Sequence, residues 1–487
     1  MGTLRAGVAK SNITTEDPQA RVHDPLYAKA LVLDDGSMRV AIVAMDVVAI
    51  GGIADISDEF LTELRTRIES ETGIPGANVL VNASHTHPPG PLLVEHAQQV
   101  ERTFDAVLHA AESMVEVTVG AGSGYEDRWI INRTLRTTDG RGWTIRQANP
   151  CPPDDEVAGL GPIDPEIGIL RVDRADGTPL AVLYNYACHP LVGVPGGAVT
   201  ANYSGFASEV IEGCLGGDAM ALFVQGAGGD VTEVTYKDFD HPRDSAPLGR
   251  MLGLSTVRAL RGIETVDATL DVVREVIRLQ RRQDVPERVA ELEAEQRALL
   301  QSMVGCTLNF RSFLPLFLKY QLNPDYPADY SWRYMQAAAR GSDELDALDE
   351  LNRANLDKYM HNIRAMEKLA RLQSNIGTLR RHEKINADSG EDEIDAEVQG
   401  IRIGDSVFIT SPAELLCQIG LDLKDFSPHE HTFVAPFSNG YMHYGPPADE
   451  YALGGYEVTE CLLAPGWYEK YMATAQDVLT RLAERRG

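Results

Sequence analysis

The stretch from Asn78 to Pro91 constrains this chain most, because it joins an apolar run to a loop that carries two histidines. The first half is typical of a buried β-strand, and the Pro- and Gly-rich second half cannot continue that strand. His85 and His87 stand two residues apart where the strand ends, so their side chains leave the chain on the same side. Both imidazoles are therefore expected near one point, which suits a metal ion or a reacting group. Neutral histidines also occur as ordinary loop residues, so the pair alone leaves both interpretations open.

Polar residues follow predicted apolar runs at three other places. One run ends in an Ala-Cys-His-Pro segment that contains His189, and another leads into a glycine-rich loop that contains Asp230 and Thr232. We expect Glu414 at the opening of a helix that begins at Ser411. Active sites of α/β proteins gather at strand ends, and two or three imidazoles with one carboxylate are a typical ligand set of zinc hydrolases.

Strands and helices alternate along the N-terminal part, and this order predicts an α/β protein with mixed β-sheets covered by helices. A long irregular section is expected over 121–164, because it is rich in Gly, Pro, Arg and Asp. The expected strands are 28–33, 39–45, 79–81, 115–119, 167–172, 180–186, 219–224, 398–403 and 406–410. The expected helices are 98–114, 205–214 and 58–70, the last with Ser57 as its N-cap.

The pattern changes after about residue 280, where apolar residues recur at spacings of three and four. This spacing predicts two long amphipathic helices, joined by an aromatic and Pro-rich section over 310–334. We interpret them as an antiparallel helical hairpin that is inserted into the α/β domain. The predicted domains are a first α/β part over 1–274, the hairpin over 275–390 and a second α/β part over 391–487.

The chain is strongly acidic, because 44 Lys and Arg against 72 Asp and Glu give a net charge of −28. Such a charge disfavours nucleic acid and anionic membranes as partners. The N-terminus lacks the segments of a secretory signal, and no apolar run is long enough to span a bilayer. The six cysteines are scattered without a framework spacing. We therefore expect a cytoplasmic protein that acts on a small molecule, with a homo-oligomer left open.

Several short motifs resemble, in the same order, those of the neutral/alkaline non-lysosomal ceramidase family. The histidine segment resembles that family's His-Thr-His-Ser-Gly-Pro, and the glycine-rich loop resembles its Gly-Asp-Val-Ser. The resemblance covers residues 5–265 and 395–470 in outline. The matching segments are Gly7 to Ile13, Ser84 to Pro91, Asn132-Arg133, Gly229 to Thr232, Pro412 to Glu414, Asn439 to Tyr444, Asp449 to Tyr451 and Gly455 to Glu457.

The resemblance implies a ceramidase-like catalytic domain that binds one zinc ion per chain. The zinc ligands that it implies are His85, His189, Glu414 and Tyr444. Zinc in such a site activates a water molecule and polarises the carbonyl group that the water attacks. The implied reaction is therefore hydrolysis of a linear carboxamide, an N-acyl compound.

The remaining catalytic residues are also implied by the resemblance. His87, Arg133 and Tyr456 are expected on the substrate side of the metal, and Thr232 takes the place of the family's serine. Glu414 or His87 is expected to accept the proton of the attacking water, and His87 to return a proton to the leaving amine. Arg133 is expected to orient a polar part of the substrate.

The chain departs from the family in its predicted hairpin and in ending without a C-terminal immunoglobulin-like domain, so we expect a substrate other than ceramide. Three alternatives stay open. The same site suits an esterase or lactonase; an amidohydrolase-type barrel also begins with His-x-His; and the chain could be a non-catalytic zinc-binding protein with a closed coordination sphere. Cys188 lies beside His189, but neighbouring strand residues point to opposite faces, so no Cys-His dyad is expected.

Overall fold

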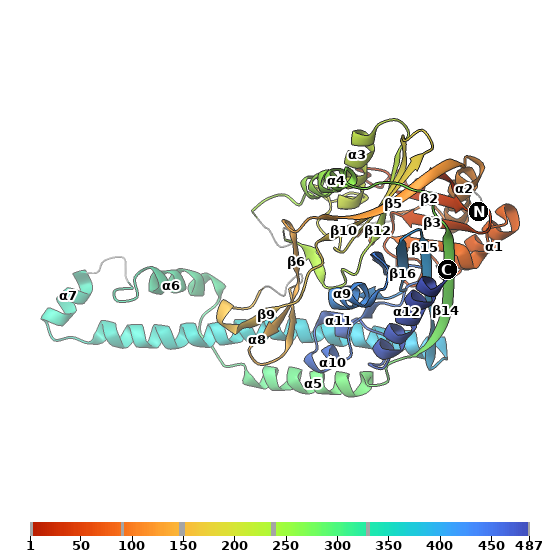
Figure 1. The fold of residues 1–487 in the computed structure, drawn as a ribbon. Coiled ribbons are helices and arrows are strands. Elements are labelled where there is room, and N and C mark those ends of the chain that lie inside the picture. Colours follow the sequence, from red (N-terminus) through yellow and green to blue (C-terminus); the bar gives the residue numbers. More distant parts are fainter. Residues whose placement is uncertain (1–2, 89–91, 146–150, 235–239, 328–331, 486–487) are drawn as a thin grey trace. The chain divides into compact units, whose positions relative to one another are not determined.

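The computed structural model describes residues 3–88, 92–145, 151–234, 240–327 and 332–485 (Figure 1). The chain forms two compact units. Unit 1 consists of Met1–Arg282 and Asn386–Gly487, and unit 2 consists of Gln283–Ile385.

The largest sheet of unit 1 has eight strands in the order β12-β11-β10-β5-β1-β2-β3-β4. Its β3–β4 and β11–β12 pairs are parallel and the other pairs are antiparallel, so the sheet is mixed, as predicted. These strands are β1 (Arg5–Asn12), β2 (Tyr27–Asp34), β3 (Arg39–Met45), β4 (Val79–Ala83), β5 (Val115–Tyr125), β10 (Glu166–Arg174), β11 (Pro179–Tyr186) and β12 (Met220–Gln225).

Helices cover one face of this sheet and a second sheet covers the other. Alternate residues of β2 show the division, because Ala30 and Val32 face a core shared with the helices while Leu31 and Leu33 face a core shared with the second sheet. The covering helices are α1 (Phe60–Thr72), α2 (His96–Glu112), α3 (Asn202–Leu215) and α4 (Ala246–Leu260). The second sheet has the order β14-β15-β16-β18, with β14 (Leu270–Gln280), β15 (Glu393–Ile403), β16 (Ser406–Thr410) and β18 (His431–Ala435). Its far side packs on α12 (Trp467–Glu484), which completes four layers.

The section predicted to be irregular contains five strands, so that prediction is wrong. They are too short for a period-two pattern to emerge, because most span three or four residues. The strands are the end of β5, then β6 (Ile130–Asn132), β7 (Thr134–Thr137), β8 (Gly142–Thr144) and β9 (Val157–Leu160). β6 pairs with β13 (Val231–Glu233), which follows the glycine-rich loop.

Two local predictions near helix starts are also wrong. Ser57 is not the N-cap of α1, because the N-cap residue is Glu59 and no side chain caps this helix. Glu414 opens no helix. It begins the short strand β17 (Glu414–Leu415), which pairs in parallel with β19 (Tyr444–Gly445), and helix α9 (Cys417–Phe426) starts later.

Unit 2 is helical, as predicted, but its connecting section is not irregular throughout. Helix α5 (Val285–Ser302) runs antiparallel to α8 (Glu344–Ser389), since Glu293 bonds Arg380 while Gln296 bonds Gln373. Between them lie α6 (Phe310–Leu322) and α7 (Trp332–Ala339). Residues 275–280, assigned above to the hairpin, belong to β14, which pairs with β15 over its whole length. No helix in the described ranges is both long and apolar enough to cross a membrane.

Candidate metal centre

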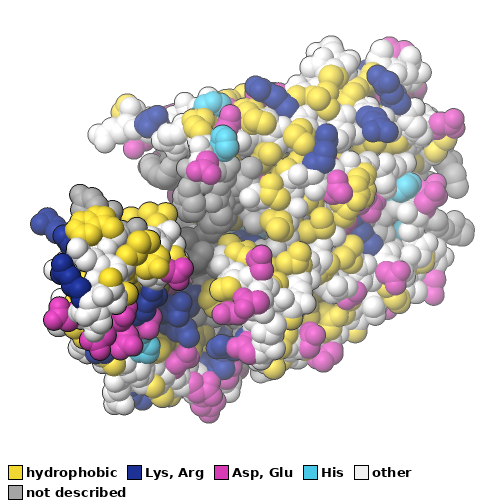
Figure 2. All heavy atoms as spheres, turned by 90° about the vertical axis from the view of Figure 1, so that its left-hand side faces the viewer, with side chains coloured by type: hydrophobic (Ala, Val, Ile, Leu, Met, Phe, Trp, Pro, Cys, Tyr) yellow, Lys and Arg dark blue, Asp and Glu magenta, His cyan; other side chains and the backbone are white. Residues whose placement is uncertain are grey.

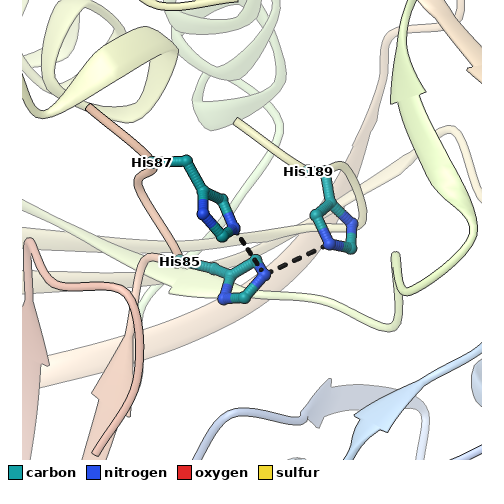
Figure 3. Close-up of side chains that lie close together, drawn as sticks. All are labelled: His85, His87 and His189. Carbon is teal, nitrogen blue, oxygen red and sulfur yellow. Dashed lines mark hydrogen bonds between the residues drawn. The ribbon is translucent and has the colours of Figure 1, made fainter. Parts of the chain in front are cut away.

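The Nε2 atoms of two histidines, His85 and His189, face each other. His85 follows β4 with a left-handed backbone (φ 64°), and His189 follows β11. Nδ1 of His85 lies 2.7 Å from the carbonyl oxygen of Val48, and Nδ1 of His189 lies 2.6 Å from that of Gly228. A carbonyl oxygen can only accept, so each Nδ1 carries a proton and each neutral ring keeps a lone pair on Nε2. These two Nε2 atoms are 3.1 Å apart (Figure 3).

Glu414 and Tyr444 add two oxygens to the same point. The parallel pairing of β17 with β19 sets these residues side by side on neighbouring strands. Oε2 of Glu414 is 3.4 Å from Nε2 of His85 and 3.2 Å from Nε2 of His189, and the Tyr444 hydroxyl is 3.2 Å from Nε2 of His189. All four side chains are buried, with exposed fractions of 5% or less.

A glycine in the glycine-rich loop allows that loop to lie against β17, the strand that begins with Glu414. Gly229 donates its backbone N–H to the carbonyl oxygen of Leu415, at 2.9 Å. A Cβ at Gly229 would lie 2.8 Å from that oxygen, which is closer than side-chain carbons come in proteins. The loop can therefore carry only glycine where it meets β17.

Three of these groups offer lone pairs and no proton to one another. With both Nδ1–H groups used by carbonyls, neither Nε2 can donate to Glu414, and Oε2 of Glu414 has no hydrogen-bond partner among the described residues. A buried acceptor without a donor is costly, and a cation removes that cost. Ligands at zinc distances in a tetrahedron lie about 3.3 Å apart, close to the separations seen here. The residues therefore fit a zinc-sized cation.

The protonation states suit a metal site. Burial, and then the charge of Arg133, lower the pKa of His189 to about 4, so its ring is neutral at pH 7. Burial alone would raise the pKa of Glu414, but His85 and His189 outweigh it and hold that pKa well below its usual range. At neutral pH the site therefore presents a neutral His189 beside the carboxylate of Glu414.

His87 completes a group of three histidines whose ring nitrogens lie within 4.8 Å of one another. Its Nε2 is 2.9 Å from Nε2 of His85, and Figure 3 shows both contacts ending on His85. Unlike the other two histidines, His87 is exposed as a residue, although burial of its ring, followed by the nearby His85, lowers the pKa of the imidazole well below its usual value. It therefore lies on the side of the cluster that solvent reaches, where a substrate would enter.

Arg133 lies between β6 and β7 and is buried against the same cluster. Nη2 donates to the Tyr444 hydroxyl at 2.9 Å and to the Gly229 carbonyl at 2.7 Å, while Nε donates to Glu457 at 3.0 Å. No described residue accepts a hydrogen bond from its Nη1. Tyr456 opens helix α11 (Tyr456–Thr459), and its ring lies 5.6 Å from the guanidinium. One guanidinium thus connects both predicted tyrosines to the site.

Two other predicted positions lie nearby but point to different partners. Thr232 forms a backbone bridge with His189, yet its hydroxyl donates to Glu233 at 3.2 Å and not to the histidines. The Asp230 carboxylate joins segments of the fold, because it accepts from Asn132 and from the Cys417 backbone. The role of Thr232 stays a prediction.

Cys188 is buried, and burial raises the pKa of its thiol well above the usual range. Its sulfur lies against the carbonyl oxygen of His189, not against the imidazole. These contacts offer no activation of a thiolate nucleophile.

Two residues of the site were not singled out from the sequence. The Tyr441 hydroxyl donates to Oε1 of Glu414 at 2.5 Å, which leaves Oε2 to face the histidines. Glu457 accepts from Arg133 and also from the hydroxyls of Thr134 and Thr144, at 3.0 and 2.8 Å. Tyr441 lies in the segment Asn439 to Tyr444 and Glu457 in the segment Gly455 to Glu457, both of which resemble ceramidase motifs. This resemblance was the only feature of the sequence that could have indicated them as site residues.

Comparison with known proteins supports the fold. No protein-family model and no curated protein sequence matches the chain. Among solved structures, a neutral ceramidase from Pseudomonas aeruginosa matches 100% of this chain and 75% of its own, with a TM-score of 0.63 and 16% identity. A structure described as ceramidase complexed with C2 matches with a TM-score of 0.64 and 14% identity, over 100% of this chain and 76% of its own. The chain therefore has a neutral ceramidase-like α/β fold, as the motif resemblance predicted.

The buried ion pair between Arg133 and Glu457 generates a stability prediction. Glu457→Gln keeps the side-chain shape but leaves the guanidinium without a buried counter-charge, so we expect a loss of about 3 kcal/mol in unfolding free energy. Arg39→Gln is the matched control, since it removes an ion pair with Asp34 in which Arg39 is 44% exposed. That control should cost less than about 1 kcal/mol. Urea unfolding measures both, and equal losses would contradict a structural role for the buried pair.

Proposed function

We propose that this chain is a zinc-dependent hydrolase that cleaves the carboxamide bond of an N-acyl compound. The observation that carries the proposal is the buried convergence of two imidazole lone pairs with an unpartnered carboxylate oxygen. His85, His189, Glu414 and Tyr444 would hold the ion. Zinc can bind a water in addition to four protein ligands, and it would supply that water with a lowered pKa and polarise the scissile carbonyl.

Proton transfer would fall to His87. It lies on the solvent side of the cluster, within hydrogen-bond distance of a ligand, and it is not needed to complete a four-ligand set. From there it can accept the proton of the attacking water, as can Glu414, and return one to the leaving amine. Its exposure also favours an open catalytic site over the closed sphere of a structural zinc protein.

Arg133 and Tyr456 would act on the substrate. Nη1 of Arg133 has no partner in the part of the chain that the structure describes. The other two nitrogens of the guanidinium are held, Nε by Glu457 and Nη2 by the Gly229 carbonyl. A fixed guanidinium with a spare donor suits a polar or anionic group of the substrate. We therefore propose an N-acyl substrate with a polar amine part, smaller and more polar than ceramide. The Tyr456 hydroxyl would donate to the carbonyl oxygen as negative charge develops there.

An esterase or lactonase would use the same residues, so this alternative stays open. An amidohydrolase-type barrel does not fit the open, mixed eight-stranded sheet, because that barrel is closed and parallel.

The first prediction from this proposal concerns metal content. Purified protein should contain about one zinc per chain, and His85→Ala and Glu414→Ala should lose it. His96→Ala is the control, since that ring bonds Ser57 and Glu63 and should leave zinc in place. Protons compete for the same lone pairs, so zinc should be held at neutral pH and released as the pH falls toward about 4, the pKa of His189. Elemental analysis decides this, and a fully active wild type without metal would refute the proposal.

A second prediction concerns the substrate. On a panel of N-acyl compounds, those with an anionic group on the amine part should show kcat/KM at least about tenfold above those with a neutral amine part, because a hydrogen bond to a charged group contributes about 1.5–3 kcal/mol. Matched esters in the same panel separate an esterase from an amidase. Faster turnover of long-chain ceramide than of every smaller amide would overturn the substrate class while leaving the metal chemistry intact.

The two tyrosines should differ in their effects. Tyr456→Phe removes one hydroxyl, so kcat should fall by about 10²–10³ with zinc retained. Tyr444→Phe deletes a ligand oxygen and should weaken zinc retention instead. Tyr451→Phe is the control, because that hydroxyl donates to the Leu463 carbonyl at 2.9 Å. If Tyr456→Phe raises KM with kcat unchanged, the hydroxyl acts in ordinary binding and not on the transition state.

A further inference from the structure

Helix α6 of unit 2 is apolar on two opposite sides, and only one of them is covered. Phe313 and Tyr320 are buried in a core shared with α8, where the Phe313 ring lies 4.5 Å from that of Tyr359. The uncovered side carries Phe310, Leu314, Leu318 and Leu322, with exposed fractions of 64, 41, 47 and 84%. These four follow i, i+4 spacing, so they form one stripe along the helix. We call this stripe the α6 face.

The α6 face is held rigidly. One carboxylate, that of Asp349 on α8, accepts a hydrogen bond of 2.6 Å from Tyr320 of α6 and another of 2.6 Å from Tyr334 of α7. An Asn309–Ser312 capping box fixes the start of α6. The apolar stripe is therefore a preformed surface, and binding to it would cost little ordering.

The charge around the α6 face differs from that of the whole chain. Helices α6 and α7 contain Arg311, Lys319 and Arg333 and no acidic residue, although acidic residues outnumber basic ones in the chain as a whole. Unit 2 has nearly equal numbers of both signs, so unit 1 carries almost all of the net charge of −28. Exposed charges act over about a Debye length of 8 Å, so the cations of α6 and α7 act on whatever lies next to these helices.

α7 extends the same character, with Trp332 and Met335 exposed by 55 and 62%. Figure 2 shows hydrophobic side chains next to Lys and Arg on unit 2, with Asp and Glu also nearby. The acids near these helices include Asp325, which follows α6, and Asp349, whose carboxylate is engaged by the tyrosines of α6 and α7. Exposed leucines and aromatic residues with cations on the same helix are the pattern of a helix that lies in the interface of an anionic bilayer.

We propose that the α6 face is a docking surface for an anionic lipid membrane. The leucines and Phe310 would enter the boundary between headgroups and acyl chains, and Arg311 and Lys319 would contact the lipid phosphates. This inference does not depend on the reaction proposed for unit 1. It differs from the expectation, drawn from the net charge of the whole chain, that anionic membranes are disfavoured.

The test is co-sedimentation of the full chain with phosphatidylcholine vesicles, with and without phosphatidylglycerol. The wild type should bind the anionic vesicles better, and added salt should weaken that binding. Leu314→Ser with Leu318→Ser should lower the partition coefficient by about tenfold or more, since it removes two inserted side chains. Arg311→Gln with Lys319→Gln should lower binding to anionic vesicles by about fivefold per charge and leave the weak binding to neutral ones.

The matched control is Leu348→Ser with Leu351→Ser on α8. Both leucines are exposed, by 49 and 59%, but they stand among Glu344, Asp346 and Glu350, which anionic lipid repels. This variant should bind as the wild type does. The same partition coefficient for all variants, or no vesicle binding at all, would overturn the proposal. So would a dimer in light scattering that Leu314→Ser with Leu318→Ser dissociates, because the face would then belong to a second copy of the chain.

Discussion

The backbone carbonyls of Val48 and Gly228 decide what the centre of unit 1 can bind. Each accepts from Nδ1 of a histidine and thereby leaves the Nε2 lone pair facing inward. Once both rings are fixed in this way, Oε2 of Glu414 meets two acceptors and no donor among the described residues. A positive charge between these atoms would remove the cost of burying an acceptor without a donor. Such hydrogen bonds from the outer nitrogen are the means by which proteins orient histidine ligands.

The polar residues around this centre form one buried chain of contacts. Glu457 holds Arg133, Arg133 holds the Tyr444 hydroxyl, and that hydroxyl reaches His189. Burial lowers the pKa of His189, and the guanidinium lowers it further, so proton competition for the ligand set is weak at neutral pH. The same cation favours negative charge on an incoming group. Under the proposed function, stability, metal affinity and substrate orientation would all depend on the same side chains, which would explain why so many charged groups are buried together.

The two units differ in net charge and in the apolar side chains that they expose. Unit 1 carries the site and almost all of the negative charge, whereas unit 2 is nearly neutral and exposes apolar side chains on α6 and α7. An acidic surface keeps an enzyme soluble and would repel anionic lipid by itself. A separate, neutral helical unit can offer a lipid-compatible face because local charge acts over a short range only.

The sequence by itself determined the elements with strong local periodicity and the residue types at the ends of strands. It predicted the mixed α/β fold, and it placed His85 and His189 after apolar runs that the structure brings together, since such runs leave clear local patterns. Arg133 was predicted only through the family resemblance, because its segment shows no periodicity. The tertiary structure decided the rest. Glu414 and Tyr444 meet through a two-residue parallel pairing, which has no period to detect and which displaced the helix expected at Ser411. Which imidazole nitrogen faces the site depends on carbonyls far along the chain, and the exposure of the α6 face depends on which of two apolar sides packs on α8. Long-range pairing and packing set these features, and local sequence cannot encode them.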